Sequence, residues 1–413
     1  MRFDTVIIGG GLAGLICGLK LQKAGKKCAI VSSGQNTLHF FSGSFGLLSR
    51  LPDGTSVTDP ISSISSLHGN HPYAKIGVER VKTYADEFTN ILTDCGIKYK
   101  KSNEGNGYII SASGSVKPCW IALDEMAFLK SKDEIIGKKA LIVNIKDFLD
   151  FNTSFIAESL EKRGTECRIE AVSTDSLQSL MSNPTELRSA GIAKVMSSED
   201  NRNEFITKVN SLIKDEDVLI LPAIFALNHD SDDIRRSISI KTCFIGTLPP
   251  SVPGIHTQIL LKKAFESAGG VYLKGDKAIS ADFESDSVIG IKTANLGDVV
   301  LEADSFVLAS GSYFGHGLVA EKDKITEPVF GLDVDFDSDR NNWYSKSFFS
   351  RQNYLGFGVK TSVDFKAIRN GVVIDNLYAA GSILGGANPL YEGSGSGIAI
   401  MTALSIADSI LTN

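Results

Sequence analysis

Near its beginning the chain reads RFDTVIIGGGLAG over residues 2–14. The apolar, β-branched run at residues 6–8 predicts a strand that is buried on both faces of a parallel sheet. Gly9 permits a tight turn, Gly11 lets the backbone approach a phosphate, and Gly14 lets a helix pack closely on the strand. The stretch therefore predicts a dinucleotide-binding turn.

The residues around this turn support the same interpretation. A helical pattern follows from Leu15 to a stop at Gly25, and residues 27–31 form a second apolar strand. The free amides and the positive dipole end at the start of such a helix favour an anionic group. The alternative is an ordinary β-α-β unit with a tight turn and no ligand.

Composition excludes several classes of function. The chain has 413 residues, 43% apolar and 22% charged, with a net charge of −6. These values are typical of a soluble protein of two or three domains, and they predict no nucleic-acid partner. No run reaches the ~18–20 apolar residues of a membrane span, so any membrane association requires a partner or a surface patch.

The cysteine pattern predicts buried free thiols in the protein core and does not predict a metal site. Six are scattered along the chain without a CxxC pair, which predicts no disulfide framework, zinc site or iron–sulfur cluster. We expect buried thiols, no bound metal and a reducing, cytoplasmic location.

The middle of the chain predicts a separate layer. Strand and helix patterns alternate through residues 136–245, which favours an inserted α/β domain. The predicted fold class is α/β, with a Rossmann-like FAD/NAD(P)-binding domain built on a doubly wound sheet. Residues 1–135 and 246–413 would form that discontinuous domain.

Two further glycine-rich segments lie late in the chain. One is a buried strand ending in small residues at 305–312, and the other is a strand, a glycine loop and a long apolar helix at 376–410. Ligands bind beyond the carboxyl ends of strands in doubly wound sheets, so the first and last segments predict one elongated site. The predicted cofactor-binding glycines of these later segments are Gly311, Gly381, Gly385, Gly386, Gly393 and Gly395.

The order of these segments resembles the superfamily of fumarate reductase flavoprotein subunits. A more specific resemblance, to the family of B subunits of anaerobic glycerol-3-phosphate dehydrogenase, runs through the whole chain. It is carried by residues 1–15, 38–40, 42–44, 51–54, 247–252, 318–321, 331–334 and 381–386.

This resemblance implies a flavoprotein subunit that takes part in oxidising sn-glycerol 3-phosphate to dihydroxyacetone phosphate. Electrons would pass to quinone during anaerobic growth. The resemblance implies FMN as cofactor, and it implies two partners, a separate catalytic polypeptide and a membrane-associated iron–sulfur subunit. It also implies a cytoplasmic location, at the inner face of the membrane through a partner subunit.

One position departs from the general dinucleotide pattern. An acidic residue about 20 residues after the glycines normally binds the adenosine ribose, and that place falls on Ser32. A serine lacks the charge-assisted, two-point grip of a carboxylate. This agrees with FMN, and FAD stays open as the alternative.

Oxidising an alcohol requires a base for the hydroxyl proton. Three histidines lie beside glycine-rich or proline-rich segments and are the predicted catalytic residues: His39, His256 and His316. The alternative for each is a surface or capping role. We expect the remaining histidines, His68, His71 and His229, to be solvated. The loop of Ser42, Gly43 and Ser44 resembles one that lies near the flavin in related flavoproteins, so all three are predicted cofactor-binding residues with Gly9, Gly11, Gly14 and Ser32.

Few obvious acid–base residues are available, which favours relaying electrons beside the catalytic partner over catalysis by this chain. Two rival functions stay open. The first is a stand-alone FAD-dependent oxidoreductase of the fumarate reductase type. The second is a structural subunit without flavin, although the glycines of the third segment would then have no evident use.

Overall fold

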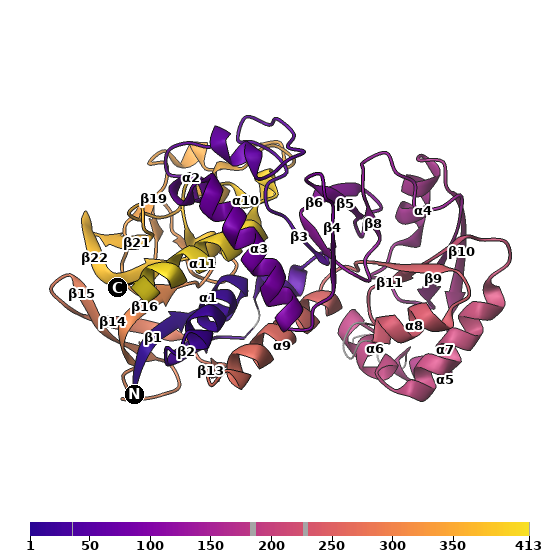
Figure 1. The fold of residues 1–413 in the computed structure, drawn as a ribbon, viewed down its shortest axis with the longest axis horizontal. Coiled ribbons are helices and arrows are strands. Elements are labelled where there is room, and N and C mark those ends of the chain that lie inside the picture. Colours follow the sequence, from indigo (N-terminus) through magenta and orange to yellow (C-terminus); the bar gives the residue numbers. More distant parts are fainter. Residues whose placement is uncertain (35, 182–186, 226–229, 413) are drawn as a thin grey trace. The chain divides into compact units, whose positions relative to one another are not determined.

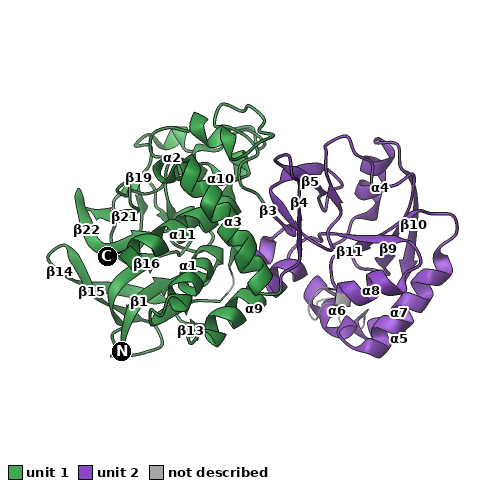
Figure 2. Cartoon of the chain, viewed as in Figure 1, with its two compact units in different colours: residues 1–37, 46–96, 258–413 green, residues 38–45, 97–257 purple. Residues whose placement is uncertain are grey.

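The chain folds into two compact units, each built around a parallel sheet (Figure 2). The computed structural model describes residues 1–413 except 35, 182–186, 226–229 and 413. Unit 1 consists of Met1–Thr37, Gly46–Gly96 and Gln258–Asn413, and unit 2 of Leu38–Phe45 and Ile97–Thr257.

Unit 2 contains the predicted insert, residues 136–245, and is larger than it. It also includes residues 38–45, 97–135 and 246–257, which the sequence pattern places in the first domain. The physical reason is strand pairing: residues 44 and 45 pair antiparallel with residues 122 and 121. Such long-range pairing leaves no mark in local sequence pattern.

The centre of unit 1 is a six-stranded sheet, and its strands appear around the label β1 in Figure 1. The strand order is β13 (Val271–Lys274), β2 (Cys28–Ser32), β1 (Arg2–Ile8), β16 (Glu302–Leu308), β22 (Val372–Ala379) and β21 (Lys366–Arg369). The first five are mutually parallel, and β21 is antiparallel to β22.

The strand β1 has the character predicted for it. Val6 and Ile7 are fully buried, as expected for a strand with parallel neighbours and both faces covered. The predicted α/β fold with a Rossmann-like, parallel sheet is confirmed.

The helices of unit 1 include a long pair, α1 and α11, that pack against each other. Lys20 of α1 forms an ion pair with Asp408 of α11, with 2.6 Å between Nζ and Oδ1. The helices are α1 (Leu12–Lys23), α2 (Pro72–Ile76), α3 (Val78–Asp94), α10 (Pro389–Glu392), α11 (Gly395–Thr412) and most of α9 (Val252–Ser267).

The helix α11 is long and apolar enough, by length and composition, to cross a membrane. Its 18 residues have a mean hydropathy of 1.4, so the expectation that no segment reaches this limit was wrong. However, 61% of the helix is buried inside the fold, and it carries the ion-paired Asp408. These features are typical of a core helix, which is the role that the apolar stripe of this segment predicts.

The remaining elements of unit 1 are an antiparallel pair of seven-residue strands, together with shorter strands and 3-10 turns. They are β14 (Ala278–Glu284), β15 (Ser287–Thr293), β17 (Val319–Ala320), β18 (Ile325–Thr326), β19 (Val334–Asp335), β20 (Gly358–Val359) and the 3-10 turns Ser62–Ser66, Arg340–Asn342, Asn353–Gly356 and Gly381–Ile383.

Unit 2 contains a four-stranded parallel sheet in the order β10 (Glu166–Val172), β9 (Lys139–Ile145), β11 (Val218–Pro222) and β12 (Lys241–Ile245). Its helices are α4 (Thr153–Glu161), α5 (Asp175–Met181), α6 (Ser189–Met196), α7 (Glu199–Leu212) and α8 (Asp230–Ser237). Two antiparallel sheets complete the unit, formed by β3 (Ser44–Phe45), β7 (Ile121–Leu123) and β4 (Tyr99–Lys101), and by β6 (Val116–Cys119), β5 (Gly107–Ile110) and β8 (Phe128–Leu129). The 3-10 turn Thr37–Phe40 leads into this unit.

Candidate flavin-binding site

The first glycine segment joins β1 to α1 and leaves one side of its backbone open. Gly9 has a φ of 119°, and a Cβ there would lie 2.1 Å from the carbonyl oxygen of Ala309. A Cβ on Gly14 would lie 1.9 Å from the oxygen of Gly9. A Cβ on Gly11, in contrast, would meet only Asn36, at 3.8 Å. Gly9 and Gly14 therefore allow close packing, and Gly11 borders free space.

The second and third segments lie next to the first. The amide of Ala309 donates to Ile8 (2.7 Å), and the amide of Ala380 donates to Leu308 (2.9 Å). These hydrogen bonds bring the carboxyl ends of β1, β16 and β22 together at one edge of the sheet, as predicted. Gly381, with a φ of 76°, follows β22 and would place a Cβ 3.1 Å from that of Ala13.

At the start of α11, part of the space that a ligand could use is filled by other residues of the chain. The amide of Gly46 donates to the hydroxyl of Ser396 (2.7 Å), and the amide of Gly397 donates to the oxygen of Gly46 (2.8 Å). Gly393 has a φ of 63°, and a Cβ there would lie 2.0 Å from the hydroxyl oxygen of Ser49. A Cβ on Gly395 would lie at an ordinary 3.5 Å from Pro389.

The other predicted glycines of the late segments border protein. A Cβ on Gly386, where φ is 91°, would lie 2.5 Å from the oxygen of Asn70, and one on Gly385 would lie 3.2 Å from the oxygen of Gly358. Gly311 has a φ of 77° and a more open setting, with the hydroxyl of Ser382 at 3.6 Å. Close packing between loops thus explains why residues 385 and 386 are glycines. A side chain at Gly311 would have more space around it.

A buried histidine–glutamate pair, whose glutamate lies in the third segment, is the main feature that sequence reasoning missed. His71 and Glu392 have side chains only 2% and 1% exposed, with 3.2 Å between Nε2 and Oε2. The expectation that His71 is solvated was therefore wrong. His71 Nδ1 accepts a hydrogen bond from the amide of Tyr73 (3.1 Å), so Nε2 is left to donate to Glu392. His68 is exposed as expected, and His229 lies outside the described residues.

Further hydrogen bonds hold Glu392 in its ionised form. It accepts from the amide of Asn388 (2.9 Å) and the hydroxyl of Ser394 (3.1 Å). Burial raises the pKa of Glu392, but hydrogen bonds from His71, Asn388 and Ser394 outweigh it and leave that pKa below its ordinary value of 4.5. The carbonyl of Glu392 also accepts from the amides of Ser49 and Arg50. The pair thus anchors the loop that leads into α11.

An aspartate that is distant in sequence follows the strand beside Ser32. Ser32 ends β2 and is 4% exposed, and its carbonyl accepts hydrogen bonds from the amides of Gly275 and Asp276, which follow β13. Asp276 is also 4% exposed, and within the described residues its Oδ2 atom is buried without a hydrogen-bond partner. The acidic residue beside Ser32 thus comes from the end of the neighbouring strand, and its Oδ1 atom accepts hydrogen bonds from the amides of Lys277 (2.8 Å) and Asn295 (3.0 Å).

The residues of the first segment fit a phosphorylated cofactor. The open space at Gly11 admits an approaching group, and the first amides of a helix have no partner within that helix. The first turn of α1 has no acidic side chain that would repel an anion. Gly9 and Gly14 have the close-packing roles that their spacing predicts, and the approach of a phosphate to Gly11 stays a prediction.

The predicted loop of Ser42, Gly43 and Ser44 belongs to unit 2. Gly43 has a φ of 83°, and a Cβ there would lie 2.6 Å from the sulfur of Met126. The hydroxyls of Ser42 and Ser44 lie 3.0 Å apart. Packing against Met126 accounts for the glycine, and a role of this loop in flavin binding stays a prediction.

The three predicted catalytic histidines are divided between the units. His39 and His256 lie in unit 2, where the amide of Ser251 donates to the carbonyl of His39 (2.7 Å). His316 lies in unit 1 and is exposed, with a φ of 56°. Among the described residues, the Nδ1 atom of His39 is buried and has no hydrogen-bond partner.

Asp150 is a further residue of unit 2 that sequence reasoning did not single out. It is 6% exposed, its Oδ1 bonds Arg188 at 2.9 Å, and within the described residues its buried Oδ2 has no partner. Burial raises the pKa of Asp150, and Arg188 opposes that shift without cancelling it. A buried aspartate of this kind is a candidate proton acceptor.

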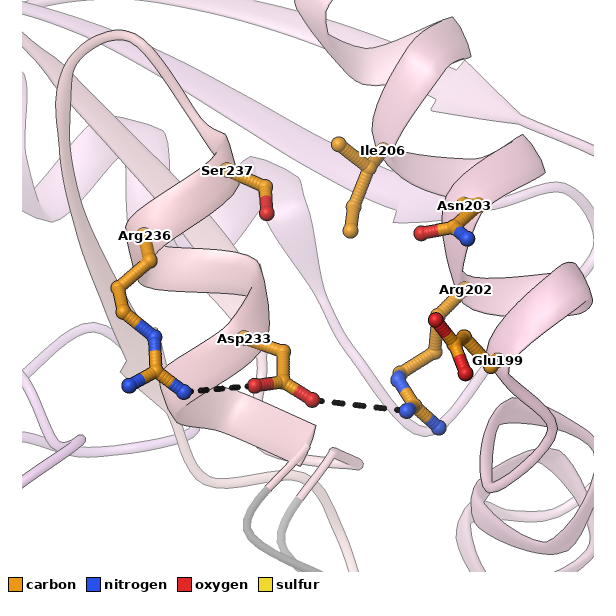
Figure 3. A pocket seen from close by; sticks show the side chains of 7 residues that line it. All are labelled: Glu199, Arg202, Asn203, Ile206, Asp233, Arg236 and Ser237. Atoms are coloured by element: carbon orange, nitrogen blue, oxygen red, sulfur yellow. Dashed lines mark hydrogen bonds and ion pairs between the residues drawn. The ribbon is translucent and has the colours of Figure 1, made fainter.

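A polar cavity of about 230 Å³ lies between α7 and α8 of unit 2 (Figure 3). Asp233 lies between two arginines, 3.5 Å from Arg202 and 2.7 Å from Arg236. The neighbouring Arg235 is paired as well, with Asp232. Because its arginines are already paired, this cavity is a poor site for a phosphate.

The cysteines are free, and four of the six are buried: Cys17, Cys28, Cys119 and Cys243. Burial raises the pKa of Cys28, Cys119 and Cys243 to about 12 in each case. Such thiols are unreactive at neutral pH. Across the described parts of the chain, no group of three potential metal ligands comes together.

Comparison with known proteins identifies the family. The model of the FAD binding domain family matches residues 4–398. The chain is 35% identical to the B subunit of anaerobic glycerol-3-phosphate dehydrogenase from Yersinia pestis bv. Antiqua, over 100% of this chain and 99% of that protein. It is 36% identical to the same protein of Pectobacterium carotovorum subsp. carotovorum, with the same coverage.

The chain belongs to the B subunit family of anaerobic glycerol-3-phosphate dehydrogenase. The family resemblance expected from the sequence is thereby confirmed, and the FAD binding domain makes the chain a flavoprotein of an oxidoreductase family. Among solved structures it is similar to 3-ketosteroid delta1-dehydrogenase from Sterolibacterium denitrificans, with 9% identity, a TM-score of 0.45, and coverage of 100% of this chain and 99% of that one.

Proposed function

We propose that this chain is the flavin-carrying subunit of an anaerobic glycerol-3-phosphate dehydrogenase. It takes part in oxidising sn-glycerol 3-phosphate to dihydroxyacetone phosphate and passes electrons toward quinone. The observation that carries the proposal is the open backbone at Gly11 in a chain that matches its family relatives over the full length. A structural subunit without flavin would have no need of that space.

We propose FAD as the flavin, in place of the FMN that the sequence favours. The matching family is described as an FAD binding domain. FAD differs from FMN by an adenosine phosphate, which needs polar groups near the end of β2. Ser32 lies there, and Asp276 follows the adjacent strand with one carboxylate oxygen, Oδ2, that has no hydrogen-bond partner among the described residues. The absence of an acidic residue at Ser32 was the argument for FMN.

A bound flavin would supply the acceptor for the two electrons that leave the alcohol carbon. This chain's own task would be to hold the phosphate of the flavin at the start of α1. For oxidation of the substrate on this chain, His39 is the proposed proton acceptor, because its Nδ1 atom has no hydrogen-bond partner among the described residues.

The proposed partners are a separate catalytic polypeptide and a membrane-associated iron–sulfur subunit, with the complex at the inner face of the cytoplasmic membrane. The relatives are each named as one lettered component of a dehydrogenase, which implies that other components exist. Whether substrate is oxidised on this chain or on the catalytic partner is decided by assaying the two polypeptides separately. A stand-alone oxidoreductase of the fumarate reductase type would reduce a dye with glycerol 3-phosphate and no partner.

The identity of the released flavin is the first test. Protein purified anaerobically is denatured, and the released flavin is treated with phosphodiesterase. FAD gives a rise in fluorescence, whereas FMN gives none. A colourless protein that takes up neither flavin on reconstitution would contradict the proposal.

A second test concerns proton transfer. We expect His39→Asn to keep its flavin and to lose about 100-fold in the rate of glycerol 3-phosphate oxidation by the assembled complex. The matched control is His68→Asn, which changes an exposed histidine and leaves the rate unchanged. Full activity in the His39 variant would remove this residue from the mechanism.

A further inference from the structure

One loop of unit 1 exposes aromatic side chains that have no role in the core. We call residues 344–352 the Phe348 loop. The side chains of Phe348 and Phe349 are 86% and 94% exposed, and Tyr344 is 60% exposed. The two phenylalanine rings pack edge to face on each other, with 5.3 Å between their centroids.

The loop is held in shape by its own hydrogen bonds. The side-chain oxygen of Gln352 accepts from the amide of Ser345 (2.8 Å), and its nitrogen donates to the carbonyls of Ser347 (2.9 Å) and Ser350 (3.1 Å). At the base, Trp343 is buried and its ring nitrogen donates to the carbonyl of Asp337 (2.7 Å). The rings at the tip are thus presented by a structured loop.

The stretch of chain that contains this loop carries charges of one sign. Residues 340–363 contain four cations and no aspartate or glutamate, in a chain whose net charge is −6. Lys346 and Arg351 flank the phenylalanines and are exposed. The preceding carboxylates, Asp337 and Asp339, are engaged at the base, where they accept hydrogen bonds from asparagine side chains.

We propose that the Phe348 loop inserts its two phenylalanines into the headgroup region of a membrane that contains anionic lipid. Aromatic rings beside lysine and arginine are typical of segments that lie in this interface. A lipid surface fits the observations better than a protein partner does, because both rings are almost fully exposed and the charged residues of 340–363 are all positive.

This inference goes beyond the proposed function and does not depend on the flavin. Membrane attachment through a partner subunit would leave this loop without a task. Direct contact would instead hold the flavin-carrying chain at the surface where quinone is dissolved.

The test uses the full chain and vesicles of phosphatidylcholine and phosphatidylglycerol in a ratio of about two to one. We expect the wild-type chain to sediment with these vesicles and to stay in the supernatant with pure phosphatidylcholine. The double variant Phe348→Ser, Phe349→Ser should lose about tenfold in partitioning. The double variant Lys346→Gln, Arg351→Gln should lose the electrostatic part of vesicle binding, which is the part that high salt removes from the wild-type chain.

The matched control is Leu149→Ser, which removes an equally exposed apolar side chain, 85% exposed, from unit 2 and should bind as wild type does. Any of three results would overturn the proposal: failure of the wild-type chain to sediment with anionic vesicles, undiminished vesicle binding by the double serine variant, or self-association of the chain through the phenylalanines in the absence of lipid. Flavin absorbance, measured on the same samples, tests the proposed function separately.

Discussion

The first and third glycine segments look alike in sequence and differ in what surrounds them. Both follow a strand and lead into a helix, yet Gly11 borders free space while Gly386 and Gly393 lie against Asn70 and Ser49. A glycine-rich loop is therefore evidence for a ligand only where a side chain would enter open space. In the third segment, several glycines are required because protein occupies the position of the side chain.

The largest effect on stability is expected for Gly9→Ala. The new Cβ would lie 2.1 Å from a backbone oxygen, at a φ of 119° that alanine rarely adopts. We expect the free energy of unfolding of the flavin-free protein to fall by about 4 kcal/mol, as measured by urea denaturation. A loss below about 1 kcal/mol would mean that β1 and β16 do not meet in this way.

An intermediate effect is expected for Glu392→Gln, which leaves the donor of His71 without its charged acceptor. We expect a loss of about 2 kcal/mol at neutral pH. The folded pKa of Glu392 lies below its ordinary value of 4.5, so the ionised group stabilises the fold above that pH. This contribution is lost as the pH falls through the folded pKa.

The difference between wild type and Glu392→Gln should therefore shrink in denaturation curves recorded below pH 4.5. Glu79→Gln, a change to an exposed carboxylate in the first turn of α3, serves as control and should show a much smaller difference. A constant difference across this pH range would contradict the assignment of an ionised Glu392.

A small effect on stability, with a large effect on flavin, is expected for Gly11→Val. The backbone at Gly11 has an ordinary φ of −81°, so the change should cost about 1 kcal/mol or less. The side chain would fill the space through which a phosphate approaches. Flavin absorbance of the purified protein should fall to near zero, and wild-type flavin content would place the phosphate elsewhere.

The smallest effect is expected for Gly395→Ala, because its Cβ would make an ordinary contact with Pro389. We expect unchanged stability, within about 0.5 kcal/mol, and unchanged flavin content. Loss of flavin in this variant would show that the start of α11 approaches the cofactor. The third glycine segment would then contact the ligand as the first is proposed to do.

Much of unit 1 could be predicted because its signals are local. The run of Val6 and Ile7, the spacing of Gly9, Gly11 and Gly14, and the apolar pattern of α11 each lie within a few residues. These patterns report burial and close approach directly. The strand order then follows from the usual topology of doubly wound sheets.

The features that were missed depend on residues far apart in the chain. His71 and Glu392 are 321 positions apart, and neither has a neighbouring pattern that predicts its partner. Asp276 approaches Ser32 only because β13 lies beside β2. Predicting such contacts requires the register of the strands, which composition and periodicity do not supply.

The sheet of unit 1 also has a consequence for synthesis on the ribosome. Its first strand, β1, pairs with β16, whose residues are translated about 300 codons later. The intervening residues 97–257 form most of unit 2, whose parallel sheet is complete within them. During translation, unit 2 can therefore fold while the nascent β1, whose other neighbour β2 is already made, still lacks its partner β16, so one edge of an apolar strand stays unpaired during most of synthesis.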